Sequence, residues 1–159
     1  MKLTSISEVK KELQHLQTKE LVELCLKLAK YKNDNKDFFG YLLFHDYDKP
    51  SFIKEVKLEI DIHFEELKLQ GNLYYVKKGL RKLLRIIIKY CKYLDDKALN
   101  AELHIYFLSK LKKSGIPYHK SQLLINLYEQ QVKKINSLIS KLHQDLQQDY
   151  VKELSDITE

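Results

Sequence analysis

The scarcity of turn-forming residues most constrains what this chain can fold into. Only four glycines and two prolines occur among its 159 residues, whereas a β-protein of this length needs turn residues after every short strand. Leu, Lys, Glu and Gln are abundant, and these side chains lose little rotamer freedom in a helix. The sequence therefore predicts an all-α fold.

Apolar residues at helical spacing indicate six or seven helices. Short connections near Gln17, Gly71 and Asp95 favour antiparallel α-hairpins. A helical bundle and a short α-solenoid both fit this pattern. Because a chain of 159 residues usually forms one domain, we expect a single all-helical domain over residues 1–159.

The end of the chain predicts one long helix. No Gly or Pro follows His119, and one apolar stripe continues from Leu124 to Ile157. A helix of about 38 residues spans roughly 57 Å, whereas a compact chain of this size has a radius of gyration of about 15 Å. The final helix is therefore expected to kink, to project from the body or to pair with a partner, with residues 144–159 as the part that projects or frays. A projecting apolar seam would suit a homodimer formed through this helix.

Positive charge is concentrated on the helix predicted over residues 73–94. This segment has five lysines, two arginines and no acidic residue, and its charge of +7 exceeds the +6 of the whole chain. A rotation of about 100° per residue separates a basic face from an apolar face. The residues expected to be buried on the apolar face are Val76, Leu80, Leu83, Leu84, Ile87, Cys91 and Leu94. The residues expected to bind a partner on the basic face are Lys78, Arg81, Lys82, Arg85, Lys89 and Lys92.

Two interpretations of the basic face remain open. Arg81 and Arg85 are the only arginines in the chain, and a guanidinium group can bind a carboxylate or phosphate through two hydrogen bonds. The face could therefore bind an acidic protein, a nucleic acid or a membrane surface. It could instead pair within the fold with acidic residues of the preceding helix. Those residues are Glu55, Glu59, Asp61, Glu65 and Glu66.

The function that these patterns favour is a non-enzymatic helical module that binds a macromolecule, first of all a protein, through its basic face. A nucleic-acid-binding protein using the same face is the alternative, although no nucleic-acid-binding motif is present. A helical metal protein or enzyme is the third possibility. Glu59, His63 and Glu66 share a helix face, but carboxylate metal sites in bundles need a second such helix. We therefore predict no metal site.

Motifs for cofactor binding or catalysis are missing. The sequence contains neither a glycine-rich nucleotide-binding loop nor a nucleophile elbow, so we predict no cofactor and no catalytic residue. His45 beside Asp46 or Asp48 could form an acid–base pair, but helix-capping aspartates are the commoner use of such a loop.

The compartment is expected to be the cytoplasm. No apolar run is long enough to span a membrane, and the first 13 residues lack the apolar core of a signal peptide. Cys25 and Cys91 lie among apolar residues. Both are expected to be buried, reduced thiols.

The first 45 residues resemble the start of small, uncharacterised bacterial all-helical proteins. The resemblance rests on a Leu-x-x-Leu helix in residues 9–16, a Glu-Leu-x-Glu-Leu helix in residues 18–24 and a short aromatic helix that includes residues 36–39. Those proteins carry no assigned activity. The resemblance therefore implies a helical fold and no function.

Overall fold

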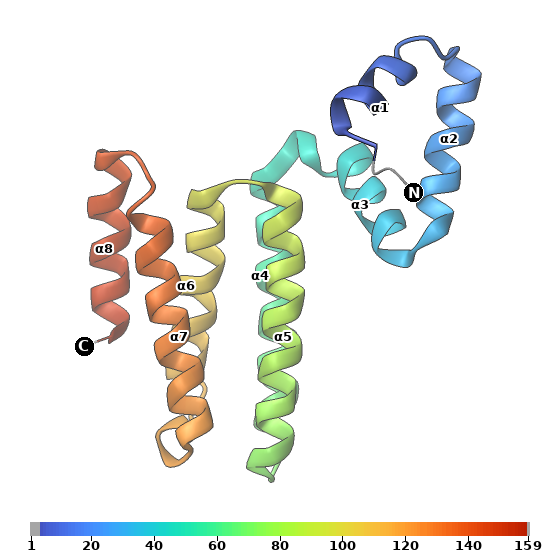
Figure 1. Cartoon of the computed structure of the whole chain (residues 1–159). Helices are drawn as coiled ribbons and strands as arrows, with labels where there is room; N and C mark the ends of the chain where they lie inside the picture. Colours follow the sequence, from blue (N-terminus) through green and yellow to red (C-terminus); the bar gives the residue numbers. More distant parts are fainter. Residues whose placement is uncertain (1–3, 159) are drawn as a thin grey trace. The chain divides into compact units, whose positions relative to one another are not determined.

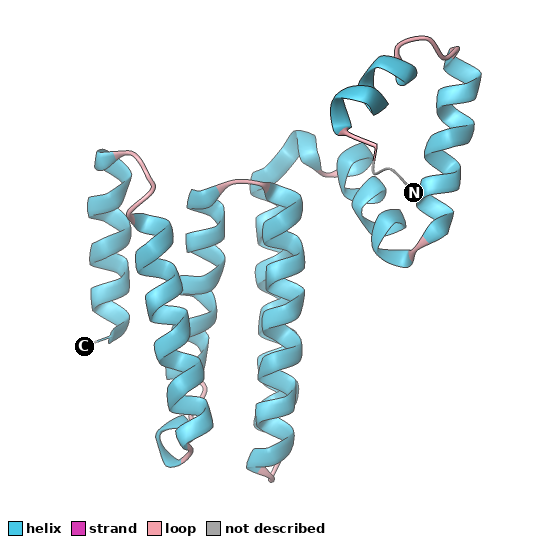
Figure 2. Cartoon of the chain, in the orientation of Figure 1, coloured by secondary structure: helices cyan, strands magenta, loops and turns pink. Residues whose placement is uncertain are grey.

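The structure is a computed structural model that describes residues 4–158. Over these residues it contains eight α-helices, two short 3-10 helices and no strand (Figures 1 and 2), which confirms the all-α prediction. Contacts within the chain divide it into two compact units, Met1–Tyr47 and Asp48–Glu159. The length of the chain alone led us to expect a single domain.

The first unit contains three helices: α1 (Ile6–Leu13), α2 (Thr18–Tyr31) and α3 (Asn33–Phe44). The beginning of α1 is fixed by a capping box, in which Ser5 Oγ accepts a hydrogen bond from the Glu8 backbone and the Glu8 carboxylate accepts one from the Ser5 backbone. α2 and α3 pack against each other. Tyr41 is the only buried side chain between residues 4 and 47, so little apolar burial stabilises this unit.

The second unit begins at Asp48, the last residue of the 3-10 turn η1 (Asp46–Asp48). Its helices are α4 (Lys49–Lys68), α5 (Leu73–Leu94), α6 (Lys97–Lys113), α7 (Gln122–Ile139) and α8 (Gln144–Thr158), with a second 3-10 turn, η2 (Tyr118–Lys120), before α7. Successive helices run in alternating directions (Figure 1). α6 contacts all four of the other helices and therefore forms the centre of the unit.

α6 carries buried residues around most of its circumference. They are Ala101, Leu103, His104, Ile105, Phe107, Leu108 and Leu111. A helix that is apolar all round must be surrounded by other elements. This pattern explains why α6, rather than the strongly amphipathic α5, occupies the centre.

The predicted basic helix is confirmed as α5, Leu73–Leu94. Asn72 caps its start by accepting a hydrogen bond from the Tyr74 backbone at 2.8 Å. Its buried residues are Val76, Leu80, Leu83, Leu84, Ile87, Cys91 and Leu94, the seven that the sequence places on the apolar face. Gly79 lies inside α5 because a Cβ at this position would collide with the Leu67 side chain of α4.

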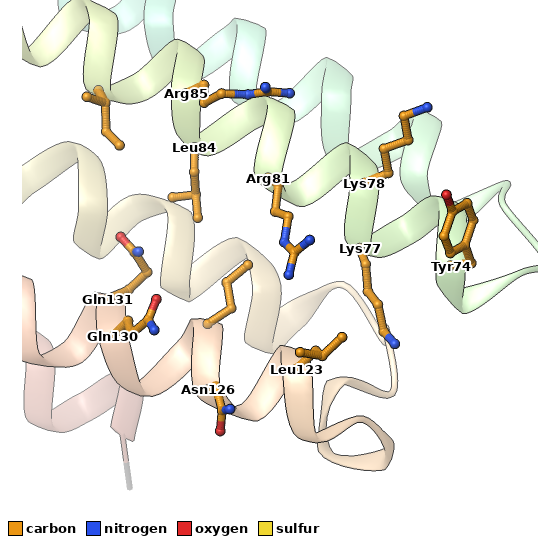
Figure 3. Close-up of a pocket in the computed structure, with 12 residues that line it drawn as sticks. Tyr74, Lys77, Lys78, Arg81, Leu84, Arg85, Leu123, Asn126, Gln130 and Gln131 are labelled. Atoms are coloured by element: carbon orange, nitrogen blue, oxygen red, sulfur yellow. The ribbon is translucent and has the colours of Figure 1, made fainter.

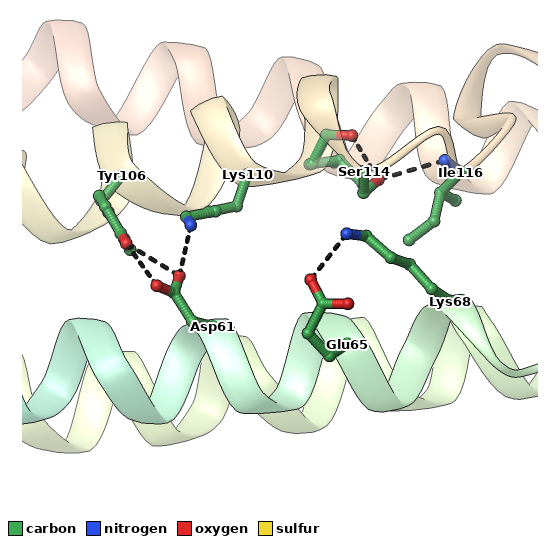
Figure 4. A network of polar contacts seen from close by, with 8 residues as sticks. Asp61, Glu65, Lys68, Tyr106, Lys110, Ser114 and Ile116 are labelled. Carbon is green, nitrogen blue, oxygen red and sulfur yellow. Dashed lines mark hydrogen bonds and ion pairs between the residues drawn. The ribbon is translucent and has the colours of Figure 1, made fainter.

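A polar network joins α4 to α6 (Figure 4). The Tyr106 hydroxyl donates to the Asp61 carboxylate at 2.8 Å, and Lys110 Nζ lies 2.8 Å from the same carboxylate. Lys57 pairs with Glu102 at 2.6 Å, and the ammonium groups of Lys57 and Lys110 each lie 5.1 Å from the Tyr106 ring centre. α4 therefore binds α6 through Asp61 and Lys57.

The prediction of one long C-terminal helix was wrong. The helix ends at Ile139, and α8 begins at Gln144 and packs on α6 and α7, so residues 4–158 form eight α-helices where six or seven were predicted. Leu154 of α8 is buried, because folding back covers apolar surface that a single extended helix would leave in water. The homodimer predicted through this segment stays a prediction. The continuous apolar seam that suggested the dimer is interrupted between α7 and α8.

The two cysteines differ in burial. Both are free thiols. Cys91 is buried on α5, as predicted, but the prediction for Cys25 was wrong, since it is exposed on α2. The helical stripe that contains Cys25 belongs to the unit that buries almost no side chains.

Candidate binding groove beside helix α5

Most of the predicted basic face lies open to solvent. Five of its six residues are exposed, and within residues 4–158 none of these five side chains forms an ion pair or a hydrogen bond. They are Lys78, Arg81, Lys82, Arg85 and Lys92. Lys89 differs, because its ammonium group lies 5.2 Å from the ring centre of Tyr90 and 6.0 Å from that of Tyr93.

Acidic residues of α4 have partners other than the two arginines of α5. Asp61 is bound by α6, as described above, and Glu65 pairs with Lys68 of its own helix at 2.7 Å. Glu59 accepts a hydrogen bond from the Tyr90 hydroxyl at 2.8 Å. The predicted pairing of the two helices therefore does not involve the arginines of the basic face.

A groove of about 750 Å³ runs between α5 and α7 (Figure 3). α5 contributes Tyr74, Lys77, Lys78, Arg81, Leu84, Arg85 and Ile88, and α7 contributes Leu123, Asn126, Leu127, Gln130 and Gln131. Figure 3 shows Lys77, Arg81 and Leu84 extending from α5 toward α7. We call this feature the α5–α7 groove.

The walls of the α5–α7 groove differ in charge. Four cationic side chains of α5 line it, while α7 lines it with leucines, one asparagine and two glutamines. No Asp or Glu is among the described residues that line it. The groove therefore combines apolar contact surface with a positive potential along one side.

A smaller groove of about 290 Å³ lies on the other side of α5, against α4. Lys82, His63 and Glu66 line it. Lys78 and Arg85 line both grooves. These two cations therefore stand on the ridge of α5 and can reach a ligand on either side.

Cys91 and His104 form a buried pair in the interior of the second unit, with Cys91 Sγ 4.0 Å from His104 Nε2. Burial raises the pKa of Cys91 to about 11, against a smaller opposing effect of Lys134. Burial, reinforced by the charge of Lys134, lowers the pKa of His104 to about 4. At neutral pH both groups are therefore uncharged, and a protonated thiol is a poor nucleophile.

His104 also has an incomplete set of hydrogen bonds. Its Nδ1 atom and the Oε1 atom of Gln131 are buried and have no partner with normal hydrogen-bond geometry. The two side chains are still near enough for Gln131 to oppose the fall in the pKa of His104. Gln131 thus connects the wall of the groove to this buried histidine.

The residues considered for a metal site are not brought together as ligands. Glu59 accepts the hydrogen bond from Tyr90, and His63 Nδ1 lies 2.9 Å from the Glu59 backbone oxygen. Glu66 is exposed. Across residues 4–158, no group of three His, Cys, Asp or Glu side chains is arranged to hold a metal ion.

The aspartates near His45 have structural roles. Asp46 accepts a hydrogen bond from the Tyr41 hydroxyl at 2.9 Å. Asp48 caps α4 by accepting one from the Ser51 backbone at 3.1 Å. Asp48 therefore has the capping role that is common for an aspartate in such a loop.

Sequence reasoning missed Lys77 and the whole α7 wall. Lys77 is half-buried at the border between the two faces of α5, where a helical projection does not decide the direction of the side chain. Leu123 lies next to the buried stripe of α7 and is 52% exposed. A leucine just outside an apolar stripe is the signal that could have suggested a contact surface there.

Comparison with known proteins gives no match to a family model, a curated protein or a solved structure. The resemblance of the first 45 residues to bacterial helical proteins therefore stays a prediction. Among the helices of residues 4–158, none has the length and apolar character needed to cross a bilayer. The geometry and charge of the α5–α7 groove are the basis for the function proposed below.

Proposed function

We propose that this protein is a non-enzymatic helical interaction module that binds an acidic protein through the basic face of α5. The observation that carries this proposal is the state of Arg81 and Arg85. Both are exposed, neither has an intramolecular partner within residues 4–158, and both line a groove that also contains apolar side chains. Two arginines one helical turn apart can each form paired hydrogen bonds with a carboxylate.

An acidic protein fits this site better than a nucleic acid. Phosphate backbones are bound mainly by charge, but the α5–α7 groove also presents Leu84, Ile88 and Leu123 beside its cations. The center of a protein interface is apolar, with polar groups around it. Apolar side chains next to arginines are therefore the arrangement expected for a protein partner.

Replacing both arginines by glutamate tests the proposal. The double variant Arg81→Glu/Arg85→Glu should reduce partner capture from a cell extract at least about tenfold, because two charge-assisted contacts become repulsive. Its thermal unfolding and far-ultraviolet circular dichroism should change little, since both side chains are exposed. Quantitative mass spectrometry of the captured proteins provides the measurement.

The matched control is Lys141→Glu/Lys152→Glu. It changes the net charge by the same amount at two exposed residues outside α5 and outside the groove. This control variant should capture the partner as well as the wild type does. Equal capture by wild type and by the arginine variant would remove the proposal.

Nucleic-acid binding is the alternative function, and the tyrosines at the start of α5 favour it. Tyr74 and Tyr75 are 65% and 55% exposed and lie beside the cations of α5. Exposed aromatic rings next to basic residues can stack on single-stranded bases. Fluorescence titration with single-stranded and duplex oligonucleotides at low and moderate salt tests this function, because binding through phosphates weakens steeply with salt. No binding at low salt would exclude it.

We keep the cytoplasm as the proposed compartment. Cys25 is an exposed free thiol. Thiols of this kind persist in a reducing environment and are oxidised outside it. Imaging of a fluorescent fusion in the source cells would test this location.

A further inference from the structure

The α5–α7 groove exposes apolar side chains as well as cations. Ile88 is 36% exposed and Leu123 is 52% exposed, while Leu84 and Leu127 lie deeper at 8% each. Covering apolar surface is favourable by roughly 25 cal/mol for each Å² removed from water. A ligand of this groove therefore gains most if it presents a continuous apolar stripe.

The two walls of the groove favour different ligand groups at the two edges of the ligand's apolar stripe. Lys77, Arg81 and Arg85 on α5 favour carboxylates. Asn126 and Gln130 on α7 are exposed amides, which accept and donate hydrogen bonds without favouring either charge. The complementary ligand is therefore acidic along one edge and neutral along the other.

The length of the groove corresponds to a few helical turns. Along α5 the lining runs from Tyr74 to Ile88, which is about 21 Å at 1.5 Å per residue. A groove between two helices accommodates a third helix, whose anchors recur at positions i, i+3, i+4 and i+7. A ligand helix of roughly 14 residues would fill its length.

We propose that the α5–α7 groove binds an amphipathic α-helix of the partner protein. The apolar stripe of that helix covers Leu84, Ile88 and Leu123, and its acidic edge lies along α5 against Arg81 and Arg85. This inference rests on the proposed function and adds the conformation, polarity and binding position of the partner segment.

Selection from a peptide library provides an unbiased test. A displayed library of random peptides, each about 14 residues long to match the groove, is selected against the full-length protein. Enriched peptides should carry apolar residues at helical spacing, with Asp or Glu on one adjoining edge. The most enriched peptide is then synthesised with a fluorescent label, and its affinity is measured by anisotropy. Its helicity should rise on binding.

Two variants test whether the bound peptide lies in the α5–α7 groove. Leu123→Glu puts a charge into the apolar contact, and Asn126→Trp fills the groove from the α7 side with a bulky neutral side chain. Both residues are exposed, so the fold should tolerate the changes, and circular dichroism checks this. Each variant should weaken binding of the selected peptide at least tenfold. The control Leu58→Glu changes a leucine of α4 that is 61% exposed, and it should bind like the wild type.

The outcomes separate this inference from the proposed function. Acidic peptides that depend on Arg81 and Arg85 but bind both groove variants normally would overturn the groove and retain the basic face. Binding that is unaffected by Arg81→Glu/Arg85→Glu would overturn both. Failure of the library to enrich, or enrichment of proline-rich or basic peptides, would overturn the amphipathic helix as the ligand.

Discussion

His104 shows how a single buried residue couples stability to pH. It lies on the central helix α6 with an exposed fraction of 0%. Desolvation is the largest cause of its low pKa, because transfer of a charged imidazolium into the protein interior is unfavourable. Its unpaired Nδ1 atom adds to the cost of keeping a polar group there.

The shift in His104 predicts a loss of stability in acid. The pKa is about 4 in the folded protein and 6.5 in the unfolded chain, so between these values the unfolded state binds a proton that the folded state does not. The free energy of unfolding should therefore fall as the pH decreases below about 6.5, by roughly 3 kcal/mol at pH 4.

Urea unfolding of the wild type and of His104→Leu at several pH values measures this effect. The titration of carboxylates affects both proteins, so the comparison isolates the histidine. The wild type should lose about 3 kcal/mol more than the variant between pH 7 and pH 4. Parallel pH curves for the two proteins would contradict the assignment.

At the scale of helices, a polar residue just before a helix can cap its first turn. Asp96 is the N-cap of α6 and accepts hydrogen bonds from the Ala98 and Leu99 backbones at 2.8 and 3.0 Å. Asp95 ends α5 in the left-handed conformation, with φ of 46°. This conformation is unfavourable for most residues other than glycine.

The two aspartates predict opposite effects of substitution. Asp96→Ala should lower the free energy of unfolding by about 1 kcal/mol, because two backbone N–H groups lose their acceptor. Asp95→Gly should leave stability unchanged or raise it by up to about 1 kcal/mol, since glycine adopts positive φ without strain. Chemical denaturation of both variants provides the measurement, and an unchanged midpoint for Asp96→Ala would count against the cap.

The break between α7 and α8 could not be predicted from the apolar pattern of the sequence. The segment around Ser140 has neither glycine nor proline, so nothing in its composition marks a turn. Ser140 Oγ donates to the Ser137 backbone oxygen, and Gln147 donates to the Leu142 backbone oxygen, which satisfies carbonyl groups left free at the turn. These local bonds permit the turn, and the burial of Leu154 on the other helices favours it.

At the scale of the whole molecule, apolar burial is divided unequally between the two units. Apart from Tyr41, every buried side chain among residues 4–158 lies in the second unit. Hydrophobic burial is the main favourable contribution to folding. We therefore expect the second unit to fold alone.

Expression of residues 48–159 tests this independence. The fragment keeps Asp48, the N-cap of α4, and it should unfold cooperatively with a midpoint within a few degrees of the full chain. Circular dichroism melting curves of both proteins give the comparison. A fragment that stays unfolded would show that the first unit contributes essential contacts.

Composition and periodicity together determined the helical class, the extent of α5 and which of its residues are buried, because helix formation and one-sided burial follow from local sequence. Periodicity also placed Arg81 and Arg85 on the exposed face. Only the tertiary structure decided that α4 binds α6 through Asp61, that α8 folds back, and that α7 forms the second wall of the groove. Those features depend on which helices meet in space, and the apolar stripe of a helix does not specify the helix that will cover it.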